Sequence, residues 1–424
     1  MVLSSDNSDD GTTDDTSSTP PPGSTRRRVL QLAGGTGAVT ALGSIGWIGR
    51  TAYFTGERDR TQVGDSSQTG SLADGPRAQS VPSDSLLTEL QAFSEQRGDV
   101  GLQGAVVFDD GTRWIGTAGN AAHGNQTSLS HDFHLYIGSV TKFFTAALVL
   151  RYVDRGDLAL TDTIDEWLDF ERASDGSIRM LLNHTSGVPN YTEDAWFIAR
   201  YFGRPTKRWE PETLADVVDG KSFNFEPGAR HLYSNTNYVL LGLVLERLTG
   251  TQYGRLLRTL VRDKLGYERT YYLNYPDDAP IANAYDESIF KLGRRNLTGF
   301  RTSLETGAYT AGGILSTAPD VARFVRSVFK GRFLGDETLS EMRSFVEAPD
   351  EDVPAQRGYG LGIRHLQIDG EDLYGHTGTI PGYSAITLYH ENPQYTIAVL
   401  SNVSTIDQTG IYGNLQDVVL EEFY

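Results

Sequence analysis

Short strand-like runs stand at both ends of the chain, separated by a long helical stretch, and this pattern limits the possible folds most. Asp110-Gly111 joins the first two runs and predicts a hairpin, because this dipeptide favours the tight turn of antiparallel strands. Helical periodicity dominates residues 143–305, for instance in "TNYVLLGLVLERLTG", which ends at Gly250. The runs from both ends therefore pair in one antiparallel sheet. They are "LQGAVVFDD", "TRWIGTAGNA", "GYGLGIRHLQI", "DLYGHTG", "YSAITLYHE" and "YTIAVLSN".

Helices are expected beside this sheet, at residues 85–97 and in the last segment, "YGNLQDVVLEEF". The predicted fold class is α/β: an antiparallel sheet flanked by helices, with an inserted, mainly helical subdomain. One domain is predicted at residues 84–424. Its sheet part covers about 84–142 and 306–424, and its helical part about 143–305.

The first 83 residues have a different character. Residues 1–50 combine a polar tail, rich in Ser, Thr and Asp, with Arg26-Arg27-Arg28 and an uncharged stretch at 29–49. This order resembles a twin-arginine export signal, and residues 51–83 are predicted to be a flexible linker. We expect export to an extracellular or cell-surface location. Cleavage stays open, and the uncharged stretch is long enough to anchor the chain in a membrane.

The composition excludes some classes of function. The chain has 55 Asp and Glu against 37 Lys and Arg, giving a net charge of −18, and only six of its basic residues are lysines. Such an acidic, lysine-poor surface is halophile-like and argues against nucleic acid as a partner. Because there is no cysteine, disulfides and cysteine-based zinc sites are excluded.

The apolar run "YIGSVTKFFTAALVL" contains a serine and a lysine three residues apart, Ser139 and Lys142. Residues at this spacing share a helix face, so hydroxyl and amine can meet at the start of the helix. A serine hydroxyl becomes a nucleophile when a base takes its proton and donors stabilise the oxyanion. Taken alone, the four-residue pattern is weak evidence.

Two further stretches strengthen the indication: Tyr233-Ser234-Asn235 before a predicted helix, and His376-Thr377-Gly378 on a predicted strand. In this order the three elements resemble the S-x-x-K, Y-x-N and K/H-T-G signatures of penicillin-recognising serine hydrolases. Flanking segments such as "LLNHTSGVPNY" and "AGGILSTAPDVARF" are similar to the group of class C beta-lactamases, D-alanyl-D-alanine carboxypeptidases and esterases. The resemblance covers about residues 84–424 and implies a beta-lactamase/transpeptidase-like fold.

The resemblance also implies a role for each residue. Ser139 would be the acylated nucleophile, with Lys142 and Tyr233 as its proton-transfer partners. Either the lysine or the tyrosine could be the base, since both normally titrate near pH 10. Asn235 would hydrogen-bond Lys142 or the substrate amide. The oxyanion hole would be formed by the backbone N–H groups of Ser139 and Thr379.

Substrate-binding roles are expected for Asn235, His376, Thr377, Gly378, Thr379 and Tyr191. Packing alone is an equal alternative for Tyr191. His376 replaces the lysine usual in beta-lactamases, which favours a peptidase or esterase. If it anchors a substrate carboxylate, binding should weaken as pH rises through an imidazole pKa near 6.5.

Other polar residues are less indicative. His131 and His134 lack a third ligand, so neither a metal site nor a cofactor is expected. His184 is expected to stabilise a turn. Thr317 and Asp320 form the pattern of a helix capping box.

We therefore expect an exported serine hydrolase that acts through an acyl-enzyme on small peptides resembling D-amino acids, or on esters. A true beta-lactamase is one alternative. A non-catalytic ligand-binding relative is another, although it would have no need of an intact Ser139, Lys142 and Tyr233. The expected partner is a small-molecule or peptide substrate.

Overall fold

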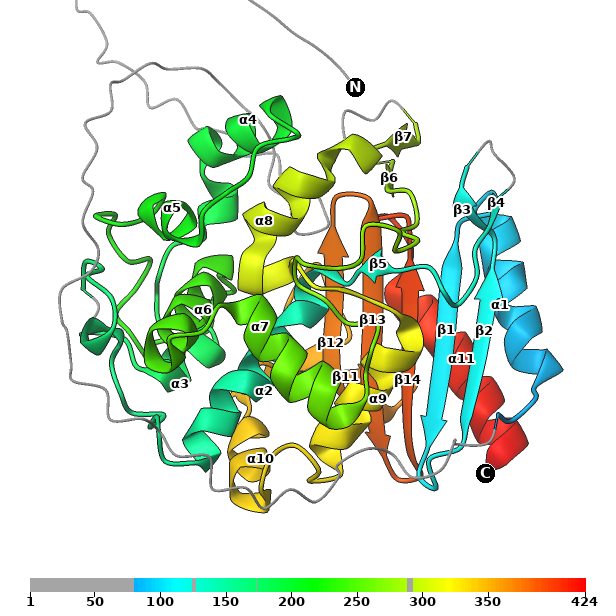
Figure 1. The fold of residues 1–424 in the computed structure, drawn as a ribbon. Helices are drawn as coiled ribbons and strands as arrows, with labels where there is room; N and C mark the ends of the chain where they lie inside the picture. The colour runs from blue at the N-terminus through cyan, green and yellow to red at the C-terminus, as the bar shows by residue number, and fades with distance from the viewer. Residues whose placement is uncertain (1–79, 124–126, 173, 288–292) are drawn as a thin grey trace, which may run out of the picture.

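An eight-stranded antiparallel sheet runs through the centre of the molecule (Figure 1). The structure, a computed structural model, describes residues 80–123, 127–172, 174–287 and 293–424. The strand order is β2-β1-β14-β13-β12-β11-β10-β9. The expected sheet built from both ends of the chain is confirmed, because β1 pairs with β14. Its strands are β1 Leu102–Phe108, β2 Arg113–Ala118, β9 Val346–Glu347, β10 Gln356–Tyr359, β11 Arg364–Ile368, β12 Glu371–Ile380, β13 Tyr383–Glu391 and β14 Gln394–Ser401.

Three short strand pairs lie outside this sheet. They are β3 Asn120–Ala122 with β4 Thr127–Ser128, β5 Leu135–Tyr136 with β8 Leu315–Ser316, and β6 Tyr285–Asp286 with β7 Arg295–Asn296.

The central strands are buried on both faces, which explains their continuous apolar sequences. In β1, Val106 and Phe108 belong to the core on the side of the first and last helices. Their neighbours Ala105 and Val107 belong to the larger core on the side of the helical part. Successive side chains of a strand point to opposite faces, so the sheet is the middle layer of three.

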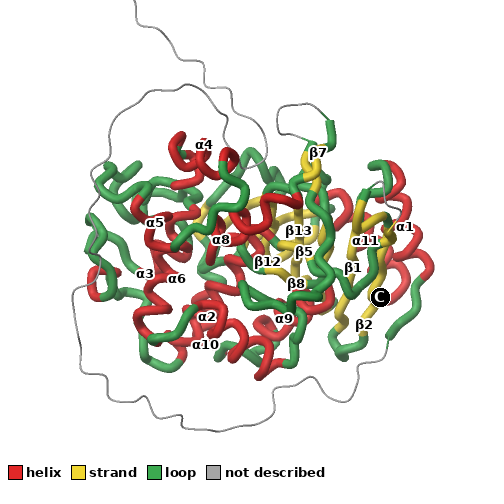
Figure 2. Tube along the Cα trace, turned by 45° about the horizontal axis from the view of Figure 1, so that its top comes forward, coloured by secondary structure: helices red, strands yellow, loops and turns green. Residues whose placement is uncertain are grey.

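The helices divide between the two faces of this sheet (Figure 2). The first and last helices, α1 and α11, pack against each other on one face, where Ser83 Oγ donates to Glu422 Oε2 at 2.6 Å. The remaining helices gather on the other face. The α-helices of both faces are α1 Asp84–Gln96, α2 Thr141–Asp154, α3 Ile178–Leu182, α4 Ala195–Gly203, α5 Pro211–Asp216, α6 Asn235–Thr249, α7 Tyr253–Leu257, α8 Arg301–Gly312, α9 Ala318–Phe329, α10 Asp336–Met342 and α11 Gln408–Phe423.

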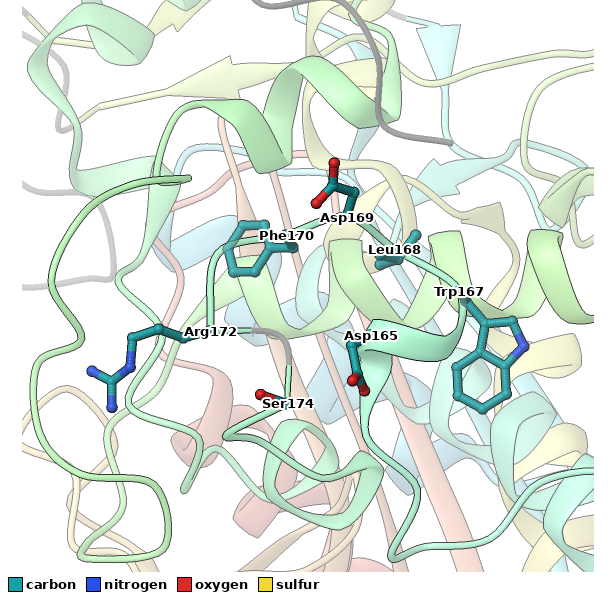
Figure 3. A pocket seen from close by; sticks show the side chains of 7 residues that line it. All are labelled: Asp165, Trp167, Leu168, Asp169, Phe170, Arg172 and Ser174. Atoms are coloured by element: carbon teal, nitrogen blue, oxygen red, sulfur yellow. The ribbon is translucent and has the colours of Figure 1, made fainter. Parts of the chain in front are cut away.

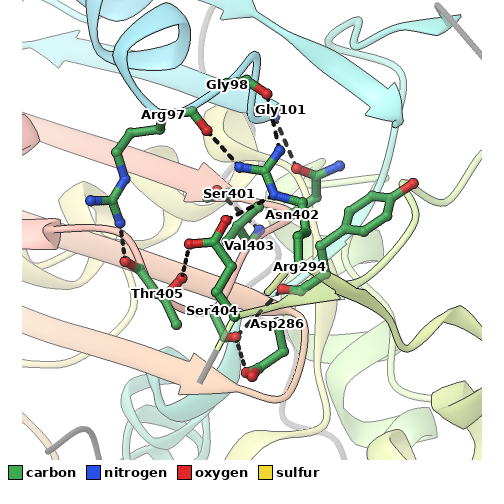
Figure 4. A network of polar contacts seen from close by, with 12 residues as sticks. Arg97, Gly98, Gly101, Asp286, Arg294, Ser401, Asn402, Val403, Ser404 and Thr405 are labelled. Atoms are coloured by element: carbon green, nitrogen blue, oxygen red, sulfur yellow. Dashed lines mark hydrogen bonds and ion pairs between the residues drawn. The ribbon is translucent and has the colours of Figure 1, made fainter. Parts of the chain in front are cut away.

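A polar network ties the end of α1 to the β6–β7 hairpin and to the segment after β14 (Figure 4). Arg294 donates from Nε to Glu287 Oε1 at 2.9 Å and from Nη1 to the Gly98 carbonyl at 3.0 Å. Thr405 Oγ1 completes the connection by donating to Glu287 Oε2 at 3.2 Å. The network joins three segments that are far apart in sequence.

Two local predictions differ from the structure. The run at 358–368 is divided between β10 and β11, because Gly362 takes a φ of 82° between them. The capping box expected at the start of α9 is wrong, because the Thr317 side chain makes no cap hydrogen bond. Asp320 Oδ2 accepts instead from the Arg269 backbone N–H at 2.8 Å, so a tertiary contact takes the place of the local one.

The predicted export signal and most of the predicted linker lie outside the described residues. Within residues 80–123, 127–172, 174–287 and 293–424, no helix is long and apolar enough to cross a membrane.

Candidate active site

Ser139 and Lys142 lie where the 3₁₀ turn η1 (Gly138–Val140) passes into α2. The spacing brings the two side chains together as expected, with Lys142 Nζ 3.2 Å from Ser139 Oγ. Ser139 is partly exposed, whereas the lysine is fully buried. A partly exposed serine therefore lies next to a buried amine.

Two carbonyl oxygens hold the Lys142 amine from its other sides. Nζ lies 2.7 Å from Asn235 Oδ1 and 2.7 Å from the Ala311 carbonyl oxygen. Burial lowers the pKa of Lys142 well below its usual value, and the charge of Arg364 lowers it further. A neutral amine has two hydrogens and one lone pair; when the carbonyls take the hydrogens, the lone pair is left for the Ser139 hydroxyl.

Tyr233 lies directly before α6, with its ring centroid 4.8 Å from Lys142 Nζ. The residue is partly exposed, but its hydroxyl is buried and lies close to Ser139 and Arg364. Burial raises the pKa of Tyr233 to about 12, partly offset by the Arg364 charge. The phenol is therefore protonated near neutrality, and of the two groups Lys142 has the pKa shift that favours a base.

Two glycines bring the expected oxyanion donors together. Gly138 has a φ of 52°, and a Cβ there would lie 2.9 Å from Thr379 N. A Cβ on Gly378 would lie 2.2 Å from the Ile137 carbonyl oxygen and 2.9 Å from Ser139 N. Only glycine permits η1 and β12 to approach this closely next to Ser139 N and Thr379 N.

The contact is made along the part of β12 that is not paired with β11. Pairing between β11 and β12 ends at Gly375, and beyond it η1 packs against β12. Thr379 is exposed at this edge, and Gln408 at the start of α11 donates to its Oγ1 at 3.1 Å. Thr377 is buried.

The surroundings of His376 disfavour the expected role as a carboxylate anchor. Its side chain is fully buried. Nδ1 faces the Thr377 carbonyl, which can only accept, so Nε2 accepts from the Tyr359 hydroxyl at 2.9 Å. Burial lowers the pKa of His376 well below its usual value, and the charge of Arg364 lowers it further. The imidazole is neutral and has no free position for a carboxylate.

Tyr191 takes the packing role that the sequence left open. It is 1% exposed, its hydroxyl donates to the Gly307 carbonyl at 2.6 Å, and its ring packs edge-on against Phe197. These contacts fit the packing alternative for Tyr191.

Arg364 at the start of β11 was not anticipated from the sequence. Its side chain is buried beside Tyr233, with the guanidinium carbon 5.4 Å from the ring centroid, and it donates to Asp350 Oδ2 at 3.0 Å. No local pattern marks an arginine twelve residues before His376 on the neighbouring strand.

The Ala311 carbonyl is the other group that the sequence did not reveal. Tyr309 has a φ of 43° and a ψ of −132°, which breaks the helical geometry near the end of α8. The carbonyls of Thr310 and Ala311 then turn toward Thr145 Oγ1 and Lys142. A main-chain acceptor of this kind leaves no signature in residue types.

His184 stabilises the turn below the site, as expected: its Nδ1 accepts from the Ser234 backbone N–H at 3.2 Å. His134 is buried against the Pro280 carbonyl, whereas His131 is exposed. Over the described ranges, no group of three His, Asp or Glu side chains could hold a metal ion.

A separate cavity of about 260 Å³ opens beside the segment that follows η2 (Ile164–Glu166) (Figure 3). None of the residues that line it belongs to the constellation around Ser139. They are Asp165, Trp167, Leu168, Asp169, Phe170, Arg172 and Ser174.

Fold and site together are those of a serine hydrolase in which a serine, a lysine and a tyrosine lie close together. Residues 87–419 match the family model described as beta-lactamase. The chain belongs to the beta-lactamase family, and the resemblance seen in its motifs is confirmed.

Three similar proteins illustrate this relationship. Penicillin-binding protein 4* of Bacillus subtilis is 28% identical over 63% of this chain and 60% of its own length, so the chain spans less than two thirds of that relative. D-amino acid amidase from Ochrobactrum anthropi SV3 superposes with a TM-score of 0.71 at 24% identity, over 80% of this chain and 99% of the amidase. A D-stereospecific amidohydrolase from Streptomyces sp. gives 0.68 at 27% identity, over 80% and 98%.

Proposed function

We propose that this chain hydrolyses D-amino-acid amides, short D-amino-acid peptides and simple esters through an acyl-enzyme on Ser139. The observation that carries the proposal is the buried Lys142 amine, held by two carbonyl oxygens with its remaining position toward Ser139 Oγ. The names of the similar amidase and amidohydrolase support the D-amino-acid amide class.

The proton transfers follow from the two shifted pKa values. Lys142 takes the hydroxyl proton as Ser139 Oγ attacks the carbonyl carbon, and the N–H groups of Ser139 and Thr379 stabilise the oxyanion. As the C–N bond breaks, Tyr233 donates its proton to the leaving amine and regains one from the Lys142 ammonium. Water then attacks the acyl-enzyme and gives a proton to Lys142, and Ser139 recovers its hydroxyl as the acid leaves.

The decisive experiment combines intact mass with hydrolysis. Wild type should form a one-to-one adduct with a fluorophosphonate and should hydrolyse D-phenylalanine amide faster than its L enantiomer. Ser139→Ala should lose the adduct and lower kcat by a factor on the order of 10⁴ to 10⁶. A fluorophosphonate adduct that persists in Ser139→Ala would place the nucleophile elsewhere.

Penicillin in the same mass experiment separates the two alternatives. A penicillin adduct that disappears with multiple turnovers would favour a true beta-lactamase. Wild type that stays unlabelled by both reagents would instead support a non-catalytic ligand-binding relative.

We further propose export by the twin-arginine route, supported by the three consecutive arginines before an uncharged stretch. Replacing Arg26, Arg27 and Arg28 by lysine keeps the charge but removes the guanidinium groups. The folded precursor should then accumulate in the cytoplasm. Unchanged secretion would refute this route.

A further inference from the structure

Asn235 stands between Lys142 and a short polar segment, residues 190–193, that precedes α4. Its Oδ1 faces Lys142 Nζ at 2.7 Å. Its Nδ2 donates to Asn190 Oδ1 at 3.3 Å and to Thr192 Oγ1 at 3.1 Å. Both amide hydrogens therefore have acceptors within the protein, and none is left for a substrate carbonyl.

The orientation of the segment is fixed by partners of unambiguous type. Asn190 Oδ1 accepts from the Asn235 backbone N–H at 3.1 Å, and a backbone N–H can only donate. Asn190 Nδ2 faces Glu193 Oε1 at 3.0 Å, and a carboxylate can only accept. Thr192 Oγ1 donates to Asn190 Oδ1 at 3.0 Å, so its lone pairs remain for Asn235. Reversing either amide would place its NH₂ group against a hydrogen-bond donor and its oxygen against an acceptor.

The direction of the Asn235 amide decides what Lys142 can do. With the oxygen toward the lysine, Asn235 and Ala311 take the two hydrogens of the neutral amine, and its lone pair is free for Ser139. With the amide reversed, the Asn235 NH₂ group would donate a hydrogen bond to that lone pair. Lys142 would then face Ser139 with an N–H group, as a donor.

We propose that Asn190 and Thr192 are positioning residues that hold the Asn235 oxygen toward Lys142 and thereby direct the lysine lone pair to Ser139. This inference rests on the proposed function, in which Lys142 is the base. It also assigns Asn235 to the lysine rather than to the substrate amide.

The test measures the second-order rate constant for fluorophosphonate labelling of Ser139 as a function of pH. Asn190→Ala should lower the plateau about 10-fold and Thr192→Val about 3-fold, whereas Thr192→Ser, which keeps the hydroxyl, should stay within about 2-fold. In these variants the Asn235 oxygen is no longer held as an acceptor for the Lys142 ammonium, so the pKa of Lys142 should fall. The acid limb, in which the labelling rate rises with pH, should therefore move to lower pH. A purely structural role would lower the plateau without moving this limb.

A double-mutant cycle makes the inference falsifiable. In the Asn235→Ala background, Asn190→Ala should change labelling by less than about 2-fold, because its effect passes through the Asn235 amide. Additive effects or an unmoved limb, in variants whose thermal unfolding matches wild type, would overturn the positioning role alone. Wild type that is not labelled on Ser139 would overturn the proposed function instead.

Discussion

At the scale of the residue, burial gives Lys142 its chemistry. An exposed lysine is protonated at neutral pH, but this one is enclosed and lies near the positive charge of Arg364, so its neutral form is favoured. The same burial keeps the Tyr233 phenol protonated. One physical effect thus separates the pKa values of two groups that titrate together in water, as the proposed base and acid require.

The pH dependence of kcat/KM should report this lysine. Because only the neutral amine accepts a proton, activity rises as pH increases through the pKa of Lys142, which lies below the usual 10.5. Tyr233→Phe should lower the rate and leave this limb in place. Arg364→Met removes a nearby charge and should move the limb to higher pH. A limb that moves to lower pH in Arg364→Met would contradict the electrostatic account.

A second prediction at this scale concerns His376. Since its imidazole stays neutral, KM for a carboxylate-bearing peptide and for its neutral ester should depend on pH in the same way between about pH 5 and 8. Steady-state kinetics on the matched pair would check this, with His376→Gln as the comparison variant. A loss of affinity confined to the carboxylate substrate as pH rises would restore the anchor role.

At the scale of the element, the contact between η1 and β12 determines the oxyanion hole. Gly378→Ala should reduce kcat at least about 100-fold, because its Cβ would push against the Ile137 carbonyl and Ser139 N. Gly299→Ala is the matched control, since a Cβ there meets open space. Kinetics and thermal unfolding would be measured on both variants. Equal activity of the two would show that the close approach is not needed for catalysis.

The sequence predicts the parts of the site that depend on local spacing and on the end of an element. Ser139 and Lys142 meet because residues three positions apart on a helix share a face. Tyr233 and Asn235 lie at the start of α6. The sequence could not predict the burial of His376 or the Ala311 carbonyl. The first depends on three layers of packing, and the second on the irregular backbone of Tyr309.

At the scale of the whole molecule, three distant parts of the chain converge on one point. The nucleophile comes from the N-terminal side of the helical part, Tyr233 and Asn235 come from its middle, and β12 comes from the C-terminal sheet (Figure 1). Close to them lie two buried histidines, His184 and His376, and the partly buried His231, and all three are near Arg364.

These histidines should make the folded state sensitive to acid. Burial lowers all three pKa values, that of His231 to about 4, and nearby positive charges add to the effect while Asp350 opposes it at His231. In the unfolded chain a histidine titrates near 6.5, so on acidification the unfolded state binds protons that the folded state does not. The stability that the neutral histidines contribute is therefore complete above about pH 6.5 and declines as pH falls toward the folded pKa values.

Urea unfolding at about pH 7.5, 6.5, 5.5 and 5.0 measures this decline before most carboxylates titrate. Below about pH 6 the free energy of unfolding should fall as the pH falls. The three histidines contribute up to three protons to this slope, each about 1.4 kcal/mol per pH unit, and Glu305, whose pKa burial raises to about 7, subtracts up to one. His231→Gln should reduce the slope by about one proton, whereas His131→Gln, at an exposed position, serves as the matched control. An unfolding free energy that stays constant from about pH 7.5 to 5.0, or a slope that His231→Gln leaves unchanged, would show that these imidazoles are not held neutral by the fold.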